Sequence, residues 1–343
     1  MLNTDTIKLM DAMLEQGYLI KRKHDKLPLW IYNYSQTCQF ESVWNEATLM
    51  CRGLVLDESY NVIAKPFPKF FNWEELIRMG WDIPKGKFTY SDKMDGSLGI
   101  LFNYEGETHI ASRGSFHSEQ AKEANLILNE KYSHIKFDKN ITYLFEIIYP
   151  SNRIVVNYGE KRDLVLLGMI ETSTGKDIDM SEAPEGLEIT KQHEKPVSFQ
   201  SLKDLNTSND EGFVIKFENG FRMKIKFEEY CALHRIVTNY NEKTVWEMLK
   251  NEDEVNFEID LPEEFLEWYE KTKKSFQEAY CKIENEALRV FNLIDPCTNR
   301  KNNAITIMKE NSKVAGIVFN IMDGKDYASI IWRKLKPKNE VKK

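Results

Sequence analysis

Two hydrophobic patterns divide the chain near residue 240. Before that point, short apolar runs, several with alternating polar positions, predict β-strands. These runs cover residues 53–56, 98–102, 143–148, 164–170, 212–217 and 221–226. The Asn219-Gly220 pair between the last two runs is a good signal for a two-residue hairpin. The first part of the chain is therefore predicted to be rich in strands.

Helical spacing is rare in the first part and dominates the last part. In the first part, apolar residues keep helical spacing over residues 4–16 and 118–131. After residue 240, Pro262 suits a first helical position, and a long apolar stripe follows over residues 265–291. Two further helices are predicted over residues 302–322 and 327–334. We therefore expect an α+β domain over residues 1–240 and an all-helical C-terminal domain over residues 241–343.

Composition narrows the class of protein. The chain has 343 residues, of which 42% are hydrophobic and 29% charged, so it can bury cores. No apolar run approaches the roughly 20 residues of a membrane span, and the first residues lack a signal-peptide pattern. The five cysteines lack any CxxC pair, which argues against disulfide or cysteine-rich zinc frameworks. We expect an intracellular, cytoplasmic protein with no membrane partner, from a phage or a cellular host.

Net charge decides little about the partner. The 47 basic and 54 acidic residues give a net charge of −7, which excludes a bulk electrostatic coat for nucleic acid. A local basic groove, which is what recognition needs, stays open. The last stretch, residues 333–343, is rich in basic residues and is predicted to be either a solvated tail or an RNA-backbone contact.

The segment with the clearest chemical character is Lys93-Met94-Asp95-Gly96-Ser97, which leads into an apolar run. A lysine at a strand boundary, followed by a glycine that permits close backbone approach, suits attack on a phosphate. Lysine is a nucleophile only without its proton, which near neutral pH requires burial or neighbouring cations. Taken alone, the segment is also compatible with an ordinary exposed turn.

Other short segments surround Lys93 in a definite order. Before it come residues 52–53 and 69–72, and after it come residues 112–115, 145–147, 150–156, 211–216 and 224–226. This order resembles the covalent nucleotidyltransferase superfamily of ATP-dependent ligases and mRNA capping enzymes. K-x-D-G, a lone glutamate after a strand, E-G-x-V-x-K and a final K-x-K match its motifs I, III, IV and V. Details such as Lys69-Phe70-Phe71-Asn72 resemble the phage-type RNA ligase 1 family, over residues of about 30–235.

The resemblance implies both a fold and a reaction. The fold is a nucleotidyltransferase domain with ATP-grasp-like antiparallel sheets, two of which flank an ATP cleft. In the reaction, the motif I lysine attacks the α-phosphate of ATP and expels pyrophosphate. The AMP then passes to the 5′-phosphate of RNA, and a 3′-hydroxyl finally attacks that activated end. Magnesium is the expected metal.

Mapped by motif, the resemblance makes Lys93 the nucleophile. Lys224 and Lys226 lie two residues apart on one predicted strand, so their side chains share a face. There they would neutralise the α-phosphate as charge builds and help to lower the pKa of Lys93. Arg52 and Lys69 would contact phosphate or ribose.

Five further residues take roles from the same resemblance. Glu146 would accept the ribose hydroxyl, and Glu211 would hold Mg²⁺ through water, because Mg²⁺ dehydrates reluctantly. Arg113, where the family usually has lysine, and Tyr230, four residues after Lys226, would contact RNA or phosphate. Tyr34 would pack near the nucleotide.

Each of these residues also has a plain structural interpretation. A glutamate such as Glu146 is in isolation more often a solvated charge on an edge strand. Lys224 and Lys226 alternate with apolar neighbours, as in a half-exposed strand. Tyr230 fits core packing equally well, and His234 is better explained as a structural histidine than as a general base. The motif series as a whole favours the functional interpretation.

The predicted function is an ATP-dependent RNA ligase that joins 5′-phosphate and 3′-hydroxyl ends in RNA repair. Nicked tRNA is one candidate substrate, and an end-healing kinase or phosphatase is one candidate partner enzyme. The alternatives are a capping-type guanylyltransferase that uses GTP and a non-catalytic RNA-end-binding protein on a ligase fold. The helical tail favours an RNA ligase, since DNA ligases and capping enzymes typically follow motif V with a β-rich OB fold.

Overall fold

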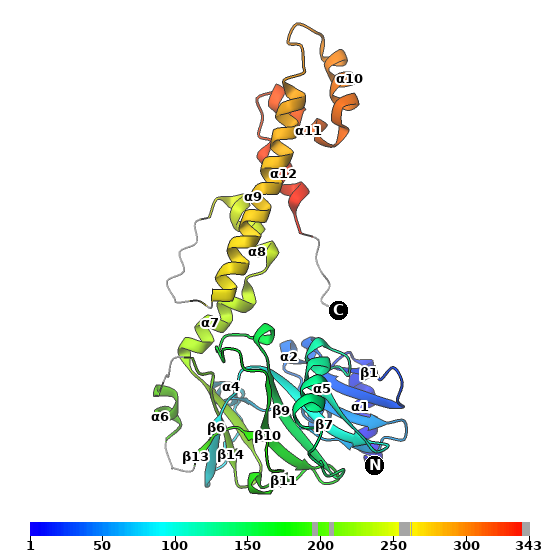
Figure 1. Ribbon diagram of the computed structural model, residues 1–343, viewed down its shortest axis with the longest axis vertical. Helices are drawn as coiled ribbons and strands as arrows, with labels where there is room; N and C mark the ends of the chain where they lie inside the picture. The colour runs from blue at the N-terminus through cyan, green and yellow to red at the C-terminus, as the bar shows by residue number, and fades with distance from the viewer. Residues whose placement is uncertain (194–197, 206–208, 254–260, 262, 338–343) are drawn as a thin grey trace. The chain divides into compact units, whose positions relative to one another are not determined.

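The computed structural model describes residues 1–193, 198–205, 209–253, 261 and 263–337 (Figure 1). Pro262 and residues 338–343 of the basic tail, both considered above, lie outside the described residues. Contacts divide the chain into an N-terminal unit, Met1–Ala232, and a helical unit, Leu233–Lys343. Within the described part, no helix combines the length and apolar character that crossing a membrane requires.

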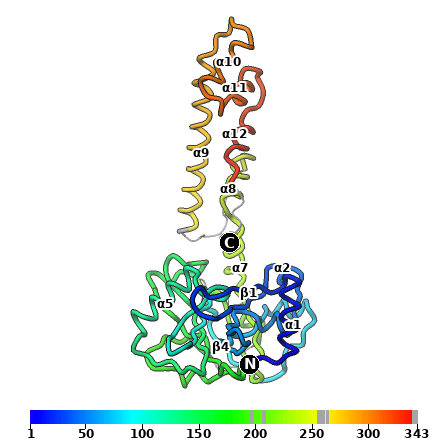
Figure 2. The backbone as a smooth tube through the Cα atoms, turned by 90° about the vertical axis from the view of Figure 1, so that its right-hand side faces the viewer, coloured from blue at the N-terminus to red at the C-terminus, as the bar shows by residue number. Residues whose placement is uncertain are grey.

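The first sheet of the N-terminal unit has four antiparallel strands in the order β1-β2-β3-β4. Its strands are β1 (Leu19–Lys23), β2 (Leu29–Tyr34), β3 (Arg52–Asp57) and β4 (Val62–Ala64). The helices that precede β1 or follow β2 are α1 (Thr4–Glu15), α2 (Gln36–Glu41) and α3 (Glu46–Met50). Figure 2 shows this part of the chain in blue. The strand register pairs Asn33 with Arg52 and so brings Tyr34 close to the start of β3.

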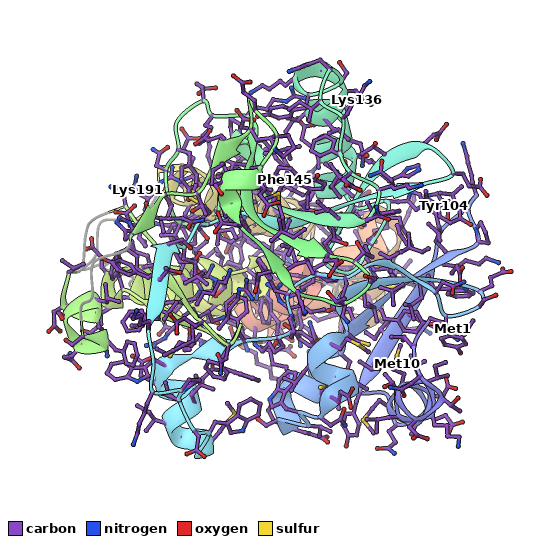
Figure 3. The ribbon with its side chains drawn as sticks, turned by 90° about the horizontal axis from the view of Figure 1, so that it is seen from below. Met1, Met10, Tyr104, Lys136, Phe145 and Lys191 are labelled. Atoms are coloured by element: carbon purple, nitrogen blue, oxygen red, sulfur yellow. The ribbon has the colours of Figure 1, made fainter. Side chains whose placement is uncertain are left out.

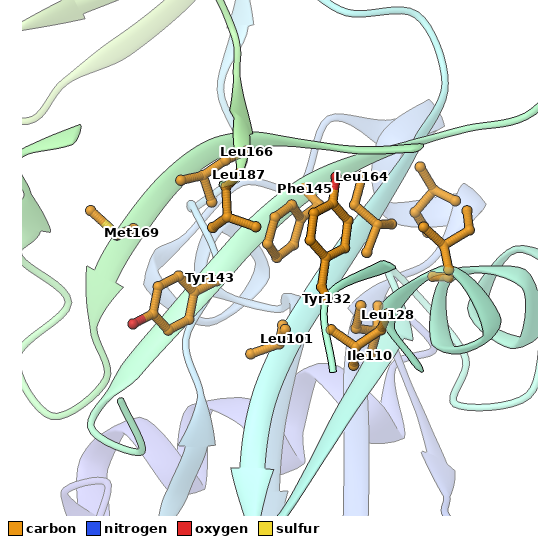
Figure 4. Packing of buried hydrophobic residues seen from close by; sticks show 13 residues of the cluster. Leu101, Ile110, Leu128, Tyr132, Tyr143, Phe145, Leu164, Leu166, Met169 and Leu187 are labelled. Carbon is orange, nitrogen blue, oxygen red and sulfur yellow. The ribbon is translucent and has the colours of Figure 1, made fainter. Parts of the chain in front are cut away.

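The second sheet has six strands, with β9 at its centre between β7 and β10. Its strands are β7 (Ser97–Tyr104), β8 (Glu107–Ser112), β9 (Ile141–Ile148), β10 (Asp163–Glu171), β11 (Asp177–Ile178) and β12 (Glu188–Ile189). Helix α5 (Glu119–Lys131) begins at its N-cap Ser118 and packs its apolar stripe against this sheet. Figure 4 shows the resulting core, in which Tyr132, Phe145 and Leu164 lie together. Phe145 is also labelled in Figure 3, within the body of the N-terminal unit.

The third sheet has the order β13-β6-β14-β15-β5. Its strands are β5 (Phe71–Asn72), β6 (Phe88–Asp92), β13 (Gln192–His193), β14 (Gly212–Phe217) and β15 (Arg222–Lys226). Helices α4 (Trp73–Met79) and α6 (Phe199–Asp204) contact β15. Short 3₁₀ turns lie at Pro150–Asn152 and Met180–Glu182.

The α+β fold and all six predicted strands are confirmed, but the N-terminal unit has three sheets instead of two. Two short pairings are parallel, β5 with β15 and β10 with β12. Only β3 of the first sheet was predicted, and β1 escaped because it is mostly exposed and basic, with Lys21, Arg22 and Lys23 in succession. A period-2 apolar pattern is absent from such a strand.

The helical unit contains six helices among its described residues. They are α7 (Glu228–Asn239), which spans the unit boundary, α8 (Glu242–Asn251), α9 (Glu263–Phe291), α10 (Arg300–Asn311), α11 (Ala315–Met322) and α12 (Ala328–Leu335). The stripe of α9 packs with α10, α11 and α12 around Ala287, Val290 and Ile317 (Figure 2). The predicted helix over residues 302–322 is wrong in one respect, since a 3₁₀ turn at Ser312–Val314 divides it. Asn311 is extended there and its side chain caps the turn, a role that favours asparagine outside helices.

Candidate active site

Lys93 lies where the chain passes from the third sheet to the second. It directly follows β6, and its backbone N–H donates a hydrogen bond to the carbonyl oxygen of Gly212 at 2.8 Å. Three residues later, Gly96 packs against β9, where an added Cβ would lie 2.7 Å from the carbonyl oxygen of Ile147. The glycine of K-x-D-G is therefore required by close packing, and it fixes Lys93 between the two sheets.

Asp95 ties this segment to two others. Its Oδ2 accepts hydrogen bonds from the backbone N–H groups of Val155 and Val156, both at 2.9 Å. Its Oδ1 accepts a hydrogen bond from the Tyr230 hydroxyl at 2.7 Å, and its own N–H donates to the Tyr158 hydroxyl oxygen at 2.9 Å. Asp95 was not among the predicted site residues, although K-x-D-G contains it. Because it is 3% exposed and fully hydrogen-bonded, it positions the loop that carries Lys93.

The Lys93 amine forms an ion pair with Glu211. Its Nζ lies 2.6 Å from Glu211 Oε2, while Lys226 Nζ lies 2.7 Å from Oε1 of the same carboxylate. Glu211 is 3% exposed and precedes Gly212, whose φ of +137° no other residue adopts easily. Burial alone would raise the pKa of Glu211, but Lys93 and Lys226 hold it below its usual range. Motifs I, IV and V thus meet at one carboxylate.

The net direction of the pKa shift of Lys93 differs from the expected one, because carboxylates outweigh the neighbouring cations. Burial would lower the pKa of the Lys93 amine, but the carboxylates of Glu211 and Glu146 outweigh burial and raise that pKa. Lys224 is the lysine of this group whose pKa lies well below its usual range. Its burial and its neighbours Lys69 and Lys93 lower that pKa. Sequence spacing could show two lysines on one face, but not the carboxylate that pairs with Lys226.

Glu146 lies on β9, the central strand of the second sheet, and is 9% exposed. The edge-strand interpretation is therefore wrong. Burial raises the pKa of Glu146 to about 8, against the opposing effect of Lys93 and Arg52. An acid held in this state can exchange hydrogen bonds with a hydroxyl group as either donor or acceptor.

Four basic side chains form a cluster that reaches Lys93 through Lys224, and none of them forms an ion pair in the described part of the chain. They are Arg52, Lys69, Arg113 and Lys224. Burial lowers the pKa of Arg52 and of Lys69, and in each the guanidinium of Arg113 lowers it further. The buried Arg52 Nη1 and Asn33 Oδ1 have no hydrogen-bond partner among the residues that the structure describes. Unpaired buried groups and surplus positive charge together indicate a site for an anionic, hydrogen-bonding ligand.

Tyr34 is brought into this cluster. Its hydroxyl oxygen accepts a hydrogen bond from Arg113 Nη1 at 3.3 Å, and Lys69 Nζ lies 5.6 Å from its ring centroid. Lys69 also lies 5.5 Å from the ring of Trp44 and 4.9 Å from that of Phe71. Neither Trp44 nor Asn33 was predicted from the sequence. The only signal for them was their place near Tyr34 and Arg52.

Tyr230 is a buried residue that holds Asp95, and its predicted contact with RNA or phosphate stays a prediction. It lies on α7, is 3% exposed, and donates its hydroxyl proton to Asp95. Lys226 Nζ lies 4.7 Å from its ring centroid. Burial, with help from Glu211 and Asp95, raises its pKa, so the hydroxyl stays protonated. His234, further along α7, is half-buried.

Metal ligands are few at this site. Across the residues that the structure describes, no group of three or more histidine, cysteine, aspartate or glutamate side chains is arranged to hold a metal ion. Both oxygens of Glu211 are engaged by lysines, as described above. A divalent ion here would need water and ligand oxygens in addition to a carboxylate, which is the usual binding mode of Mg²⁺.

Comparisons with known proteins agree with this geometry. The model of a family described as RNA ligase matches residues 50–231. A protein of Autographa californica nuclear polyhedrosis virus, described as a bifunctional polynucleotide kinase/RNA ligase, is 28% identical over an alignment of 255 residues. The alignment covers 63% of this chain and 36% of that protein. An RNA ligase of Rhodothermus phage RM378 is 23% identical, covering 89% of this chain and 87% of the phage protein. The chain thus spans about a third of the viral protein's length and most of the phage protein's.

Solved structures resemble the chain more distantly. An archaeal ATP-dependent RNA ligase covers 93% of this chain and 96% of its own, with 11% identity and a TM-score of 0.46. The Naegleria gruberi RNA ligase with PPi covers 49% of this chain and 57% of its own, with 14% identity and a TM-score of 0.37.

Proposed function

This chain belongs to the RNA ligase family, and we propose that it is an ATP-dependent RNA ligase acting through a covalent AMP on Lys93. The observation that carries the proposal is the surplus of cations around this amine. Lys93 faces Glu211 and Glu146, while its neighbours Arg52, Lys69 and Lys224 form no ion pair among the described residues. A polyphosphate supplies the negative charge that this arrangement lacks.

In the first step, Lys93 Nζ bonds to the α-phosphorus of ATP as the bond from that phosphorus to the pyrophosphate oxygen breaks. The amine must lose a proton for the adduct to form. The Glu211 carboxylate is the acceptor at hand, because it already receives a hydrogen bond from Nζ at 2.6 Å. Lys226, on the other oxygen of Glu211, keeps this carboxylate fixed while the charge moves.

The remaining basic residues suit the phosphates and the ribose. Lys224 and Lys226 lie on one face of β15, and the residues that alternate with them, Met223 and Ile225, are buried on the other face. We assign Lys224, Arg52 and Lys69 to phosphate oxygens, and Glu146 to a ribose hydroxyl. Arg113 would contact the RNA phosphate, and Tyr34 would lie beside the nucleotide. Tyr230 acts on the site through Asp95.

Protein side chains would supply only part of the ligand shell of a magnesium ion at this site. Glu211 would hold it through water, and the phosphate oxygens of ATP would complete its shell. When bound, the ion supplies positive charge that offsets the charge of the phosphates. Omitting divalent ions should therefore abolish formation of the AMP adduct.

In later steps, AMP passes to the 5′-phosphate of RNA, and the 3′-hydroxyl of another end displaces it. We propose that residues 1–240 form the adenylyltransferase domain and that the helical domain, residues 241–343, recognises the RNA. Nicked tRNA is the first substrate to test. The kinase/ligase description of the baculovirus relative supports an end-healing kinase or phosphatase as a partner.

Intact-mass measurement after mixing with a nucleotide and Mg²⁺ tests the proposal. ATP should add one AMP that is lost in acid, as a phosphoramidate is. Retention of label from α-labelled GTP and not from ATP would favour the guanylyltransferase alternative. Binding of RNA ends without any nucleotide adduct would favour the non-catalytic alternative. Nicked tRNA anticodon loops, linear single strands and nicked duplexes, compared as sealing substrates, would identify the RNA class.

A further inference from the structure

A continuous row of aromatic rings leads away from Lys69. The row consists of Tyr34, Trp44, Phe71 and Trp81. Successive ring centroids lie 5.3, 5.2 and 5.2 Å apart, and each pair meets edge to face. We call these four residues the aromatic row.

The aromatic row is buried or half-buried except at its outer end, where Trp81 reaches solvent. Tyr34 is 6% exposed and Phe71 3%, whereas Trp44 is half-buried and Trp81 is 36% exposed. Trp81 directly follows Gly80, the C-cap of α4, and its backbone N–H donates to the carbonyl oxygen of Leu76 at 3.0 Å. The backbone at Trp81 is therefore fixed by the helix end while the large indole remains accessible.

Basic side chains lie near the inner end of the row, and the exposed segment after Trp81 carries one carboxylate, Asp82, and two lysines. At the inner end, Lys69 lies against three rings of the row, and Arg113 donates to Tyr34. At the outer end, Lys85 and Lys87 are exposed on the segment that follows Trp81. Aromatic rings on which bases stack, combined with cations that track the backbone, are the usual means of binding single-stranded nucleic acid.

We propose that Trp81 is a stacking site for a base of the single-stranded RNA substrate, next to the nucleotides whose phosphates occupy the site of Lys69 and Arg113. The inference rests on the proposed function, because it supplies the RNA. An apolar protein partner is disfavoured by the exposed charged residues Asp82, Lys85 and Lys87 on the segment that follows Trp81. The other explanation is that Trp81 only covers Phe71 and so supports Lys69 indirectly.

Two substitutions separate these explanations. Trp81→Leu keeps apolar cover over Phe71 but removes the π-face, whereas Trp81→Tyr keeps an aromatic face. Phe40→Leu is the matched control, since Phe40 is an aromatic side chain 90% exposed on α2. The probe is a 5′-phosphorylated single-stranded oligoribonucleotide of about ten nucleotides, within the usual range of site sizes. Its affinity is measured over a series of salt concentrations, with AMP-adduct formation and thermal stability measured in parallel.

The stacking site predicts that Trp81→Leu weakens RNA binding roughly 5- to 150-fold, the range for one stacked base. Trp81→Tyr should retain most of the affinity. The slope of log affinity against log salt should not change, because no phosphate contact is lost. Adduct formation and melting should match those of the wild type, and Phe40→Leu should bind RNA normally.

Three outcomes would overturn the inference. Unchanged RNA affinity in Trp81→Leu removes the stacking role, and so does equal loss in Trp81→Leu and Trp81→Tyr. A shallower salt slope together with impaired adduct formation assigns Trp81 to the support of Lys69 instead. If the wild type forms no AMP adduct at all, the proposed function fails, and this result is separate from the RNA-binding comparison.

Discussion

The two units of the chain bury different kinds of side chain. In the N-terminal unit, Asp95, Glu146 and Glu211 are each at most 9% exposed, and all three act on Lys93 or on its loop. In the described part of the helical unit, the buried polar residue is Asn303, whose amide donates to the carbonyl oxygens of Asp295 and Thr298. Buried charge is expensive unless it is paired, so its concentration in one unit marks where chemistry is done.

The interiors of the two units therefore restrict residue identity in different ways. Around Lys93, residue identity is set by charge and hydrogen bonding, because a removed partner leaves another group unpaired. In the helical unit, the interior around Ile317 and Val290 is apolar, so volume and spacing are what matter.

The largest effect is expected for Lys93→Ala, which removes the proposed nucleophile. No AMP adduct should form at any nucleotide concentration, because none of the surrounding groups occupies its position between β6 and Gly96. Intact mass measures this directly. Lys122→Ala is the matched control, since Lys122 is an exposed lysine paired with Glu119. An adduct of unchanged yield in Lys93→Ala would show that another residue carries AMP.

The helical unit provides the contrasting case in Ile317→Ala. Ile317 is 0% exposed, and truncating such a residue costs about 2–5 kcal/mol of unfolding free energy. Denaturant titration should show this loss, whereas Ile305→Ala, at a site 59% exposed, should change stability little. Adduct formation well below the melting temperature should be normal in both. Loss of the adduct in folded Ile317→Ala would contradict the division of labour between the units.

The order of the motifs predicted which residues form the N-terminal site, but it did not predict the direction of the pKa shift of Lys93. Lys93, Glu211 and Lys226 were named from the sequence, and the structure brings them together because strand pairing fixes Gly212 opposite Lys226. The direction of the pKa shift of Lys93 was not predictable, since the deciding carboxylate is 118 residues away. Long-range pairing of this kind depends on tertiary structure, which a pattern of residue types does not contain.

Other features were missed because local signals were weak. Trp44 contacts Lys69 from a loop between two short helices, where neither periodicity nor a motif marks it. The division of the helix predicted over residues 302–322 depends on Asn311, whose capping role competes with the apolar spacing on either side. In contrast, α5 and α9 were predictable because their stripes are long and their caps or ends are clear.

Lys226→Ala tests the role of one charged group in the interior of the N-terminal unit. It removes one cation from Glu211 and from the developing charge on the phosphate, which should raise the adenylylation barrier by about 2–4 kcal/mol. Single-turnover rates should fall roughly 30- to 1000-fold. Lys23→Ala, a change in an exposed lysine of β1 that pairs with Glu58, is the control and should react normally. An unchanged rate in Lys226→Ala would remove Lys226 from the reacting site.

The smallest effect concerns stability and pH. Glu146 has a pKa of about 8 in the folded protein and an ordinary value of 4.5 when unfolded. Between these values the folded state holds a proton that the unfolded state has lost, so this residue makes stability fall as pH rises. Glu146→Gln, which stays neutral, should remove that contribution. Its melting temperature relative to the wild type should therefore increase from pH 5 to pH 8.

Exposed Glu160 provides the control for that measurement, since Glu160→Gln changes a carboxylate already in contact with solvent. Its melting temperature should follow the wild type across the whole range. A constant difference between Glu146→Gln and the wild type would show that Glu146 is ionised throughout. In that case the central strand of the second sheet would carry a permanent buried charge beside Lys93, and the ribose hydroxyl would meet a pure acceptor.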